Sequence, residues 1–197
     1  EATREAGVNI VSDEVYLDAS MGTEFYRPMH LRGENIISVN SLTKCYGLGP
    51  LRFGWAIGPA KMIQNVRNAF HNLQGMASAP SMAIAEAAFP HLDEALDGLR
   101  KQREVNLPKL IEVLSENGVE WTPPPFGIFG LIPLGTDAVQ AMAEYGAPLG
   151  LLATPGGMFH KDLADHLRIA WGGDPAAFEA AMPVLSQFLK SIQDGNI

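Results

Sequence analysis

Residues 36–57 read IISVNSLTKCYGLGPLRFGWAI, and this stretch decides the fold class. Its two apolar runs, 36–39 and 53–57, are rich in β-branched and aromatic residues and predict two buried strands. The link between the runs shows no helical pattern and is too short for a parallel crossover, which normally contains a helix. We therefore expect the second strand to run antiparallel to the first. This topology returns Arg52 to the sheet edge that follows the first strand, where Lys44 lies.

A third apolar run, Val8 to Val11, precedes this stretch and is followed by the acidic pair Asp13-Glu14. It predicts another strand of the same α/β sheet, with the acid at the C-terminal end of the strand. Residues 1–6 (EATREA) resemble the last turns of a helix, and Gly7 suits its C-cap. Because a domain rarely begins inside a helix, we expect further sequence upstream.

The rest of the chain predicts a helical connection followed by a smaller unit. Apolar residues recur at helical spacing over 59–73, 80–89 and 92–117. Pro108 interrupts the last of these helices, and we place the domain boundary there, between 1–107 and 108–197. Beyond it we expect short apolar segments at 119–122, 128–134 and 149–153, a helix near 137–145, a strand over 166–171 and a final helix to about 192. The predicted fold class is α/β: the end of a mostly parallel sheet domain with one antiparallel strand, followed by a smaller α+β C-terminal domain.

Composition excludes several classes of protein. The chain has 197 residues, is 47% hydrophobic and carries a formal net charge of −8, so it predicts globular structure rather than disorder. Its Lys and Arg residues are scattered, which disfavours nucleic acid and anionic membrane surfaces as partners of this segment. The single cysteine cannot form an internal disulfide, and no signal peptide or membrane-spanning run is evident. These features predict a cytoplasmic protein.

Five chemically distinct side chains are predicted at one sheet edge, and ligands of open α/β sheets bind outside the carboxyl ends of the strands. They are an acid, a phenol, a hydroxyl, an amine and a guanidinium: Asp13, Tyr16, Ser41, Lys44 and Arg52. A ligand that uses all five would carry a cationic ring nitrogen, an acidic phenolic oxygen, a phosphate and a carbonyl carbon. Pyridoxal 5'-phosphate (PLP) has these groups, so the pattern predicts a PLP site.

Four strings of sequence, in order, resemble motifs of fold-type I PLP-dependent aminotransferases of class I/II, the aspartate aminotransferase-like family. The strings are Ser12-Asp13-Glu14-Val15-Tyr16, Ser41-Leu42-Thr43-Lys44, Leu48-Gly49-Pro50-Leu51-Arg52-Phe53-Gly54-Trp55 and His166-Leu167-Arg168-Ile169-Ala170-Trp171-Gly172-Gly173. The resemblance spans nearly the whole chain, and the ordered series is more specific than any single motif. It departs from the family in lacking an N-terminal half, so the isolated chain is expected to turn over poorly.

The resemblance implies a role for each matching residue. Lys44 would bind the cofactor as a Schiff base and then move a proton between the substrate and the cofactor. Asp13 would pair with the pyridine nitrogen and keep it protonated. Tyr16 would donate a hydrogen bond to the phenolic oxygen, while Ser41 and Arg52 would hold the phosphate.

The small domain and the partners follow from the same resemblance. Arg168 matches the arginine that binds the α-carboxylate of the substrate, and its planar fork suits a carboxylate. The family is expected to act as a homodimer on an amino acid and a 2-oxo acid. Two alternatives stay open: a PLP-dependent lyase or decarboxylase of the same fold, and the ligand-sensing domain of a transcriptional regulator that carries a helix-turn-helix upstream.

Other interpretations of single motifs are weaker. The Ser-x-x-Lys pattern at 41–44 also occurs in serine acyl-transfer enzymes, but the companion Lys-Thr-Gly element is absent from the sequence. His160, Asp162 and His166 lack the spacing of a metal motif, so we expect no metal site. Cys45 is most simply a small packing residue.

Overall fold

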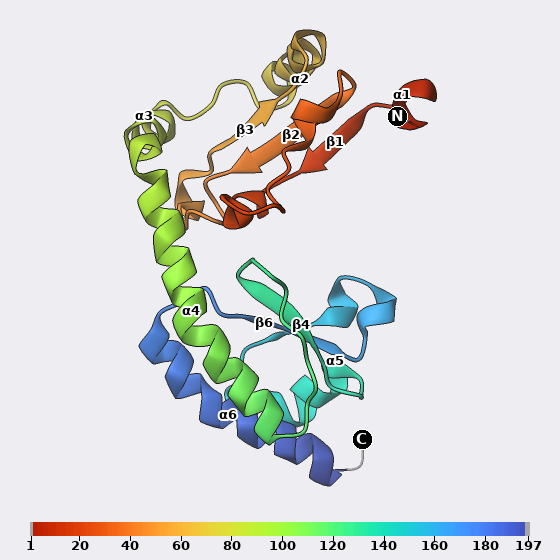
Figure 1. Ribbon diagram of the computed structural model, residues 1–197, viewed down its shortest axis with the longest axis vertical. Helices are drawn as coiled ribbons and strands as arrows, with labels where there is room; N and C mark the ends of the chain where they lie inside the picture. The colour runs from red at the N-terminus through yellow and green to blue at the C-terminus, as the bar shows by residue number, and fades with distance from the viewer. Residues whose placement is uncertain (1, 196–197) are drawn as a thin grey trace. The chain divides into compact units, whose positions relative to one another are not determined.

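The structure is a computed structural model that describes residues 2–195 and divides into two compact units, Glu1–Leu99 and Arg100–Ile197 (Figure 1). Each unit contains a three-stranded sheet. The strands are β1 (Ile10–Asp13), β2 (Ile36–Ser41), β3 (Gly54–Ile57), β4 (Phe129–Pro133), β5 (Thr154–Pro155) and β6 (His166–Ala170). The helices are α1 (Ala2–Glu5), α2 (Ala60–Leu73), α3 (Ala79–Ala88), α4 (Leu92–Glu116), α5 (Ala138–Ala141) and α6 (Pro175–Gly195). The division between the units falls inside α4, which continues as one helix through Pro108.

The first sheet has the order β1-β2-β3 and is mixed. β1 lies parallel to β2 with Ile10 opposite Ile36, and β3 lies antiparallel to β2 with Ser41 opposite Gly54. The expectation of an antiparallel third strand is therefore confirmed. A Cβ atom at Gly54 would lie 2.8 Å from the carbonyl oxygen of Asn40, so glycine lets the two strands approach at the point where the chain turns back.

Buried side chains fix the loop that joins β2 to β3. Leu42, Cys45 and Tyr46 belong to a core cluster that also contains Ala85 of α3 and Leu96 of α4. Three of the five members thus come from one short loop, so the position of that loop is set by packing as well as by the strands beside it.

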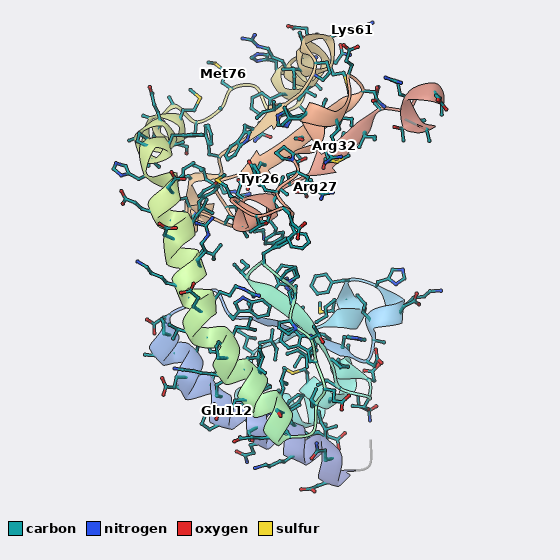
Figure 2. The ribbon with its side chains drawn as sticks, in the orientation of Figure 1. Tyr26, Arg27, Arg32, Lys61, Met76 and Glu112 are labelled. Atoms are coloured by element: carbon teal, nitrogen blue, oxygen red, sulfur yellow. The ribbon has the colours of Figure 1, made fainter. Side chains whose placement is uncertain are left out.

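The helix α2 leaves several of its apolar residues exposed to solvent. None of its residues is buried, and Val66, Phe70 and Leu73 are all exposed. Met76, on the connection to α3, projects away from the ribbon and is 86% exposed (Figure 2). The first unit therefore carries an apolar surface on α2 and the segment that follows it.

The second unit packs α6 and the C-terminal part of α4 against an antiparallel sheet of order β4-β6-β5. Its core contains Leu110 of α4, Ile132 of β4, Leu167 of β6 and Phe188 of α6, all fully buried. The α/β class is thus confirmed in its coarse form, with a mixed sheet in one unit and an antiparallel sheet in the other.

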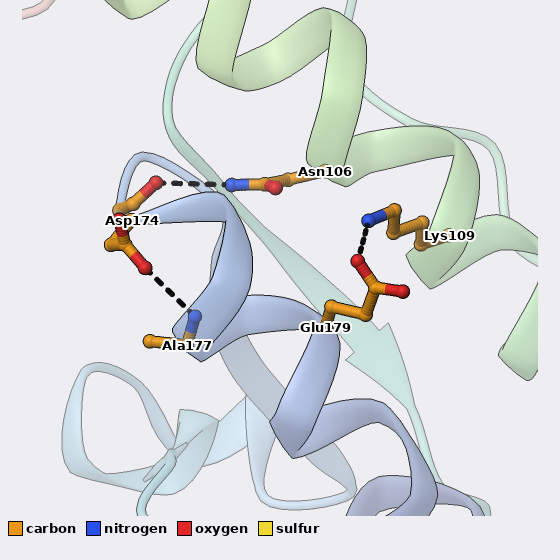
Figure 3. A network of polar contacts seen from close by, with 6 residues as sticks. Asn106, Lys109, Asp174, Ala177 and Glu179 are labelled. Carbon is orange, nitrogen blue, oxygen red and sulfur yellow. Dashed lines mark hydrogen bonds and ion pairs between the residues drawn. The ribbon is translucent and has the colours of Figure 1, made fainter.

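Polar contacts tie α4 to α6 and to the loop before it (Figure 3). The side-chain amide of Asn106 is fully buried and donates to the carbonyl oxygens of Trp171 and Gly173 at 2.8 and 3.2 Å. One turn further along α4, Lys109 forms an ion pair with Glu179 at the surface. That pair lowers the pKa of Glu179, through a hydrogen bond and through Coulombic attraction.

Two segments differ from the expected strands and helices. Residues 119–122 form no strand, and the indole of Trp121 in this segment donates to the carbonyl of Leu131 at 2.8 Å. Residues 149–153 do not pair with the sheet, and β5 begins at the next residue, Thr154, which lies opposite Arg168. No helix among residues 2–195 is long and apolar enough to cross a membrane.

Candidate functional site

Two of the candidate residues stand at the ends of neighbouring parallel strands. Asp13 is the last residue of β1, and Ser41 is the last residue of β2. The backbone N–H of Glu14 donates to the carbonyl of Val39 at 2.8 Å, so the chain leaves β1 beside the end of β2. Asp13 and Ser41 therefore share the C-terminal edge of the sheet, the edge that binds ligands in α/β folds.

Arg52 returns to this edge from the other direction, and its backbone is strained. The N–H of Leu42 donates to the carbonyl of Phe53 at 3.1 Å, which holds the start of β3 against the end of β2. Arg52 has a φ of 51°, and it is the one non-glycine residue with positive φ among residues 2–195. Its backbone N–H and its Nη1 both donate to the carbonyl of Gly49, at 3.2 and 3.1 Å. Strain of this kind persists where the surroundings impose it, and it gathers at functional sites.

Lys44 has an exposed side chain between buried residues of the loop. Its neighbours Leu42 and Cys45 are buried, whereas Lys44 is exposed and its Nζ lies 5.7 Å from the centroid of the Tyr16 ring. The hydroxyl of Ser41 accepts the N–H of Thr43 at 3.3 Å and closes the first turn of the loop. The structure thus brings an amine and a phenol together at the edge that Asp13, Ser41 and Arg52 also occupy.

Cys45, next to the exposed Lys44, is buried and chemically quiet. Its side chain is 2% exposed, and its thiol donates to the carbonyl of Val15 at 3.3 Å. Burial raises its pKa to about 11, with a smaller contribution from the negative charge of Asp18, so the reactive thiolate is scarce at neutral pH. This environment agrees with a packing role.

A buried polar network beneath the edge was not expected from the sequence. The Oδ2 atom of Asp18 accepts the side-chain amide of Asn40 and the hydroxyl of Tyr46, both at 2.7 Å. Burial, then the hydrogen bond to Asp18, raise the pKa of Tyr46. The only signal in the sequence was position, because Asn40 precedes Ser41 and Asp18 follows Tyr16 by two residues.

A second network lies along the same strands. The Oε1 atom of Glu14 accepts the hydroxyl of Ser38 at 2.6 Å and the N–H of Met29 at 2.8 Å. The backbone N–H of His30 donates to the Ser38 hydroxyl at 3.0 Å. These bonds fasten the connection before β2 to the sheet, and none of them involves the loop that carries Lys44.

Arg168 belongs to the second unit, where its guanidinium packs against aromatic rings. Its central carbon lies 4.0 Å from the centroid of the Phe129 ring and 5.5 Å from that of Phe159. Such cation–π contacts hold a guanidinium in place and leave its edge available for hydrogen bonds. Arg168 also lines a cavity of about 340 Å³, together with Thr154 and Phe178.

The histidines of the second unit pair with nearby acids. Nδ1 of His160 lies 3.6 Å from Oδ2 of Asp162, and Nδ1 of His166 lies 2.6 Å from Oδ1 of Asp165. Within residues 2–195, no group of three or more His, Cys, Asp or Glu side chains could hold a metal ion.

Comparisons with known proteins place the chain in a family. It matches the family model described as aminotransferase class I and II over residues 1–185. Among curated proteins, it is 28% identical over 171 residues to an arginine–pyruvate transaminase of Pseudomonas aeruginosa, covering 81% of this chain and 42% of that protein. It is also 28% identical over 194 residues to a histidinol-phosphate aminotransferase of Methylobacillus flagellatus, covering 93% of this chain and 48% of that protein.

Solved structures agree in fold. An aminotransferase from Mycobacterium tuberculosis superposes with a TM-score of 0.86 at 23% identity, covering 96% of this chain and 51% of that one. A PLP-dependent aminotransferase from Streptococcus suis gives a TM-score of 0.81 at 25% identity, covering 96% and 50%. The chain thus spans about half the length of these relatives. The match over residues 1–185 and the shared fold show that this chain belongs to the class I and II aminotransferases, a family of fold-type I PLP enzymes.

Proposed function

We propose that this chain forms the C-terminal half of a PLP-dependent aminotransferase that transfers an amino group from an amino acid to a 2-oxo acid. The observation that carries the proposal is the position of Lys44, whose amine lies 5.7 Å from the Tyr16 ring at the edge where β1 and β2 end. In this proposal residues 1–107 are the end of the cofactor-binding domain, and residues 108–197 are the small domain. The transaminase names of several relatives favour transamination over elimination or decarboxylation.

The donor set at the edge fits the chemical groups of PLP. The carboxylate of Asp13 suits a protonated ring nitrogen, and the phenol of Tyr16 suits the phenolic oxygen. The hydroxyl of Ser41 and the forked guanidinium of Arg52 suit a phosphate. The strained backbone of Arg52 adds support, because a left-handed arginine costs stability and is retained where its side chain must point in one direction.

Each residue then has a defined task in the reaction. When bound, PLP supplies an electron sink for the pair of electrons left on the substrate Cα. Lys44 would hold the cofactor at its aldehyde carbon, and its amine would move the proton of the substrate Cα. Asp13 keeps a proton on the ring nitrogen by Coulombic attraction. Arg168 binds the α-carboxylate of the substrate through its fork, which the rings of Phe129 and Phe159 hold in place.

The proposed activity belongs to a polypeptide about twice as long as this chain, since its relatives are about twice as long. A homodimer is part of the same proposal and follows from the family rather than from any contact of this chain. The isolated 197 residues are expected to bind PLP weakly and to turn over little, because half of the family's fold is missing from them.

Covalent trapping tests the proposal directly. The chain is incubated with PLP and reduced with borohydride, and the site of the pyridoxyl group is mapped by peptide mass spectrometry. We expect modification at Lys44 in excess of the exposed Lys61, because only Lys44 lies beside a phenol and a candidate phosphate site. Lys44→Arg keeps the positive charge and should abolish the specific adduct, whereas Lys61→Arg should leave it unchanged.

The possible outcomes of this experiment distinguish a specific cofactor site from nonspecific labelling of lysines. Preferential modification of Lys44 supports the cofactor site, and amino-donor screening with a chain extended upstream then tests transamination against elimination and decarboxylation. Equal modification of all lysines in both the 197-residue chain and the extended chain would contradict the proposal.

A further inference from the structure

We propose that Asp18 is a positioning residue that fixes the geometry between Tyr16 and Lys44 by binding one residue before Lys44, at the end of β2, and one residue after it, in the loop that joins β2 to β3. This inference deepens the proposed function and rests on it for its catalytic meaning. Its structural content is a single carboxylate oxygen that accepts hydrogen bonds from one residue on each side of Lys44.

The donor before Lys44 is Asn40, which lies in β2 next to its last residue, Ser41. Its side-chain amide donates to Oδ2 of Asp18 at 2.7 Å, and its own Oδ1 accepts the backbone N–H of Ser41 at 2.7 Å. The amide of Asn40 is therefore held at both its nitrogen and its oxygen. This arrangement fixes the direction in which the chain leaves β2.

The donor after Lys44 is Tyr46, two residues further along the loop. Its hydroxyl donates to the same Oδ2 of Asp18 at 2.7 Å. Asp18 and Tyr46 are both buried, so water competes little for this bond. Two bonds to one oxygen, from positions on either side of Lys44, leave the loop little freedom to change its width.

Asp18 also connects this loop to the segment that carries Tyr16. It lies in the 3-10 turn Leu17–Ser20, which begins directly after Tyr16. A shift of Asp18 would therefore move the Tyr16 backbone and the Lys44 loop together. This linkage therefore maintains the distance of 5.7 Å between the Lys44 amine and the centroid of the Tyr16 ring.

We call the two hydrogen bonds from Asn40 and Tyr46 to Oδ2 of Asp18 the clamp. The substitutions that test it differ in one feature at a time. Asp18→Asn keeps an acceptor oxygen where Oδ2 lies and can still accept both bonds, whereas Asp18→Ala removes the acceptor. Tyr46→Phe deletes one hydroxyl without changing the packing of the ring, so it serves if Asp18→Ala fails to fold. Ser38→Ala is the matched control, because it breaks a buried hydroxyl–carboxylate bond of the same sheet, to Glu14, that does not involve the loop.

Two readouts are measured on the 197-residue chain: amide hydrogen exchange of peptides that cover residues 41–48, and the ratio of pyridoxyl adduct on Lys44 to that on Lys61 after borohydride reduction. We expect Tyr46→Phe and Asp18→Ala to speed exchange in this loop and to lower the adduct ratio by about three- to tenfold, the effect of losing one or more buried hydrogen bonds. Asp18→Asn should restore both readouts toward those of the unsubstituted chain. Ser38→Ala should leave both near the unsubstituted values.

The two proposals fail in different ways. If the unsubstituted chain and the chain extended upstream both show no preference for Lys44, the proposed function fails, and exchange alone decides the clamp. If Lys44 is preferred but Tyr46→Phe and Asp18→Ala change neither readout, the clamp is wrong and the cofactor site stands. The clamp is also wrong if Asp18→Asn behaves like Asp18→Ala, because the effect then comes from the charge of Asp18 rather than from its bonds.

Discussion

At the scale of single residues, Arg52 is where local stability and proposed function conflict. Its φ of 51° is a conformation that glycine adopts freely and that other residues adopt at a cost of about 1 kcal/mol. A stabilising replacement was available to the sequence, since glycine would remove the strain. We therefore expect that arginine is retained at this position for its side chain.

We expect the free energy of unfolding of Arg52→Gly to be about 1 kcal/mol higher than that of Arg52→Ala, because both variants lose the arginine side chain but only glycine relieves the backbone strain. Both variants should weaken PLP trapping at Lys44, since both lose the guanidinium. Denaturant unfolding and the concentration of PLP needed for half-maximal trapping measure the two effects. Equal stability of the two variants would show that the left-handed backbone carries no strain.

At the scale of elements, α4 is held in the second unit by Asn106 as well as by apolar packing. The amide of Asn106 donates to two carbonyls at the start of the loop before α6, and its Oδ1 atom has no partner in the described part of the chain. Two carbonyls, one of the buried Trp171 and one of the exposed Gly173, thus share one donor side chain. A polar residue in this position specifies where the loop meets α4, which an apolar residue could not do.

We expect Asn106→Ala to lower the free energy of unfolding of the second unit by about 2–3 kcal/mol, because the carbonyls of Trp171 and Gly173 lose their buried donor. Lys109→Gln is the control on the same helix, since it breaks an ion pair with an exposed carboxylate, and its effect should be small. Denaturant unfolding followed by the fluorescence of Trp121 and Trp171 compares them. A Lys109→Gln effect as large as that of Asn106→Ala would contradict this ranking.

At the scale of the whole molecule, the chain carries apolar surface that its own residues leave uncovered. Leu73 is 88% exposed and Met76 is 86% exposed, and α2 as a whole contains no buried residue. Surfaces of this kind promote association in solution. They contribute little to the stability of the chain by itself, because their apolar area stays in contact with water.

We expect the double substitution Phe70→Gln and Leu73→Gln to reduce self-association while changing the free energy of unfolding by no more than about 0.5 kcal/mol. Phe188→Ala, in the core of the second unit, should instead cost about 3–5 kcal/mol and should not reduce association. Light scattering over a range of concentrations and thermal unfolding check both. A large loss of stability in the α2 variant would mean that these side chains pack in solution.

The sequence by itself determined the local helices and strands and the order of the candidate site residues along the chain. Strand and helix periods depend on neighbouring residues, and the link before Arg52 was too short for a parallel crossover, so the antiparallel β3 could be predicted. Where a strand begins depends on its partner, so β1 starts at Ile10, opposite Ile36, rather than at Val8.

Only the tertiary structure decided what supports the site. Asp18 meets Asn40 and Tyr46 across 22 and 28 residues of sequence, and no local pattern encodes a contact of that separation. The left-handed backbone of Arg52 is likewise imposed by the turn from Gly49 into β3. Spacing along the chain fixes which groups reach the sheet edge, whereas buried hydrogen bonds between distant residues fix how those groups are held, because such bonds form only once the core has packed.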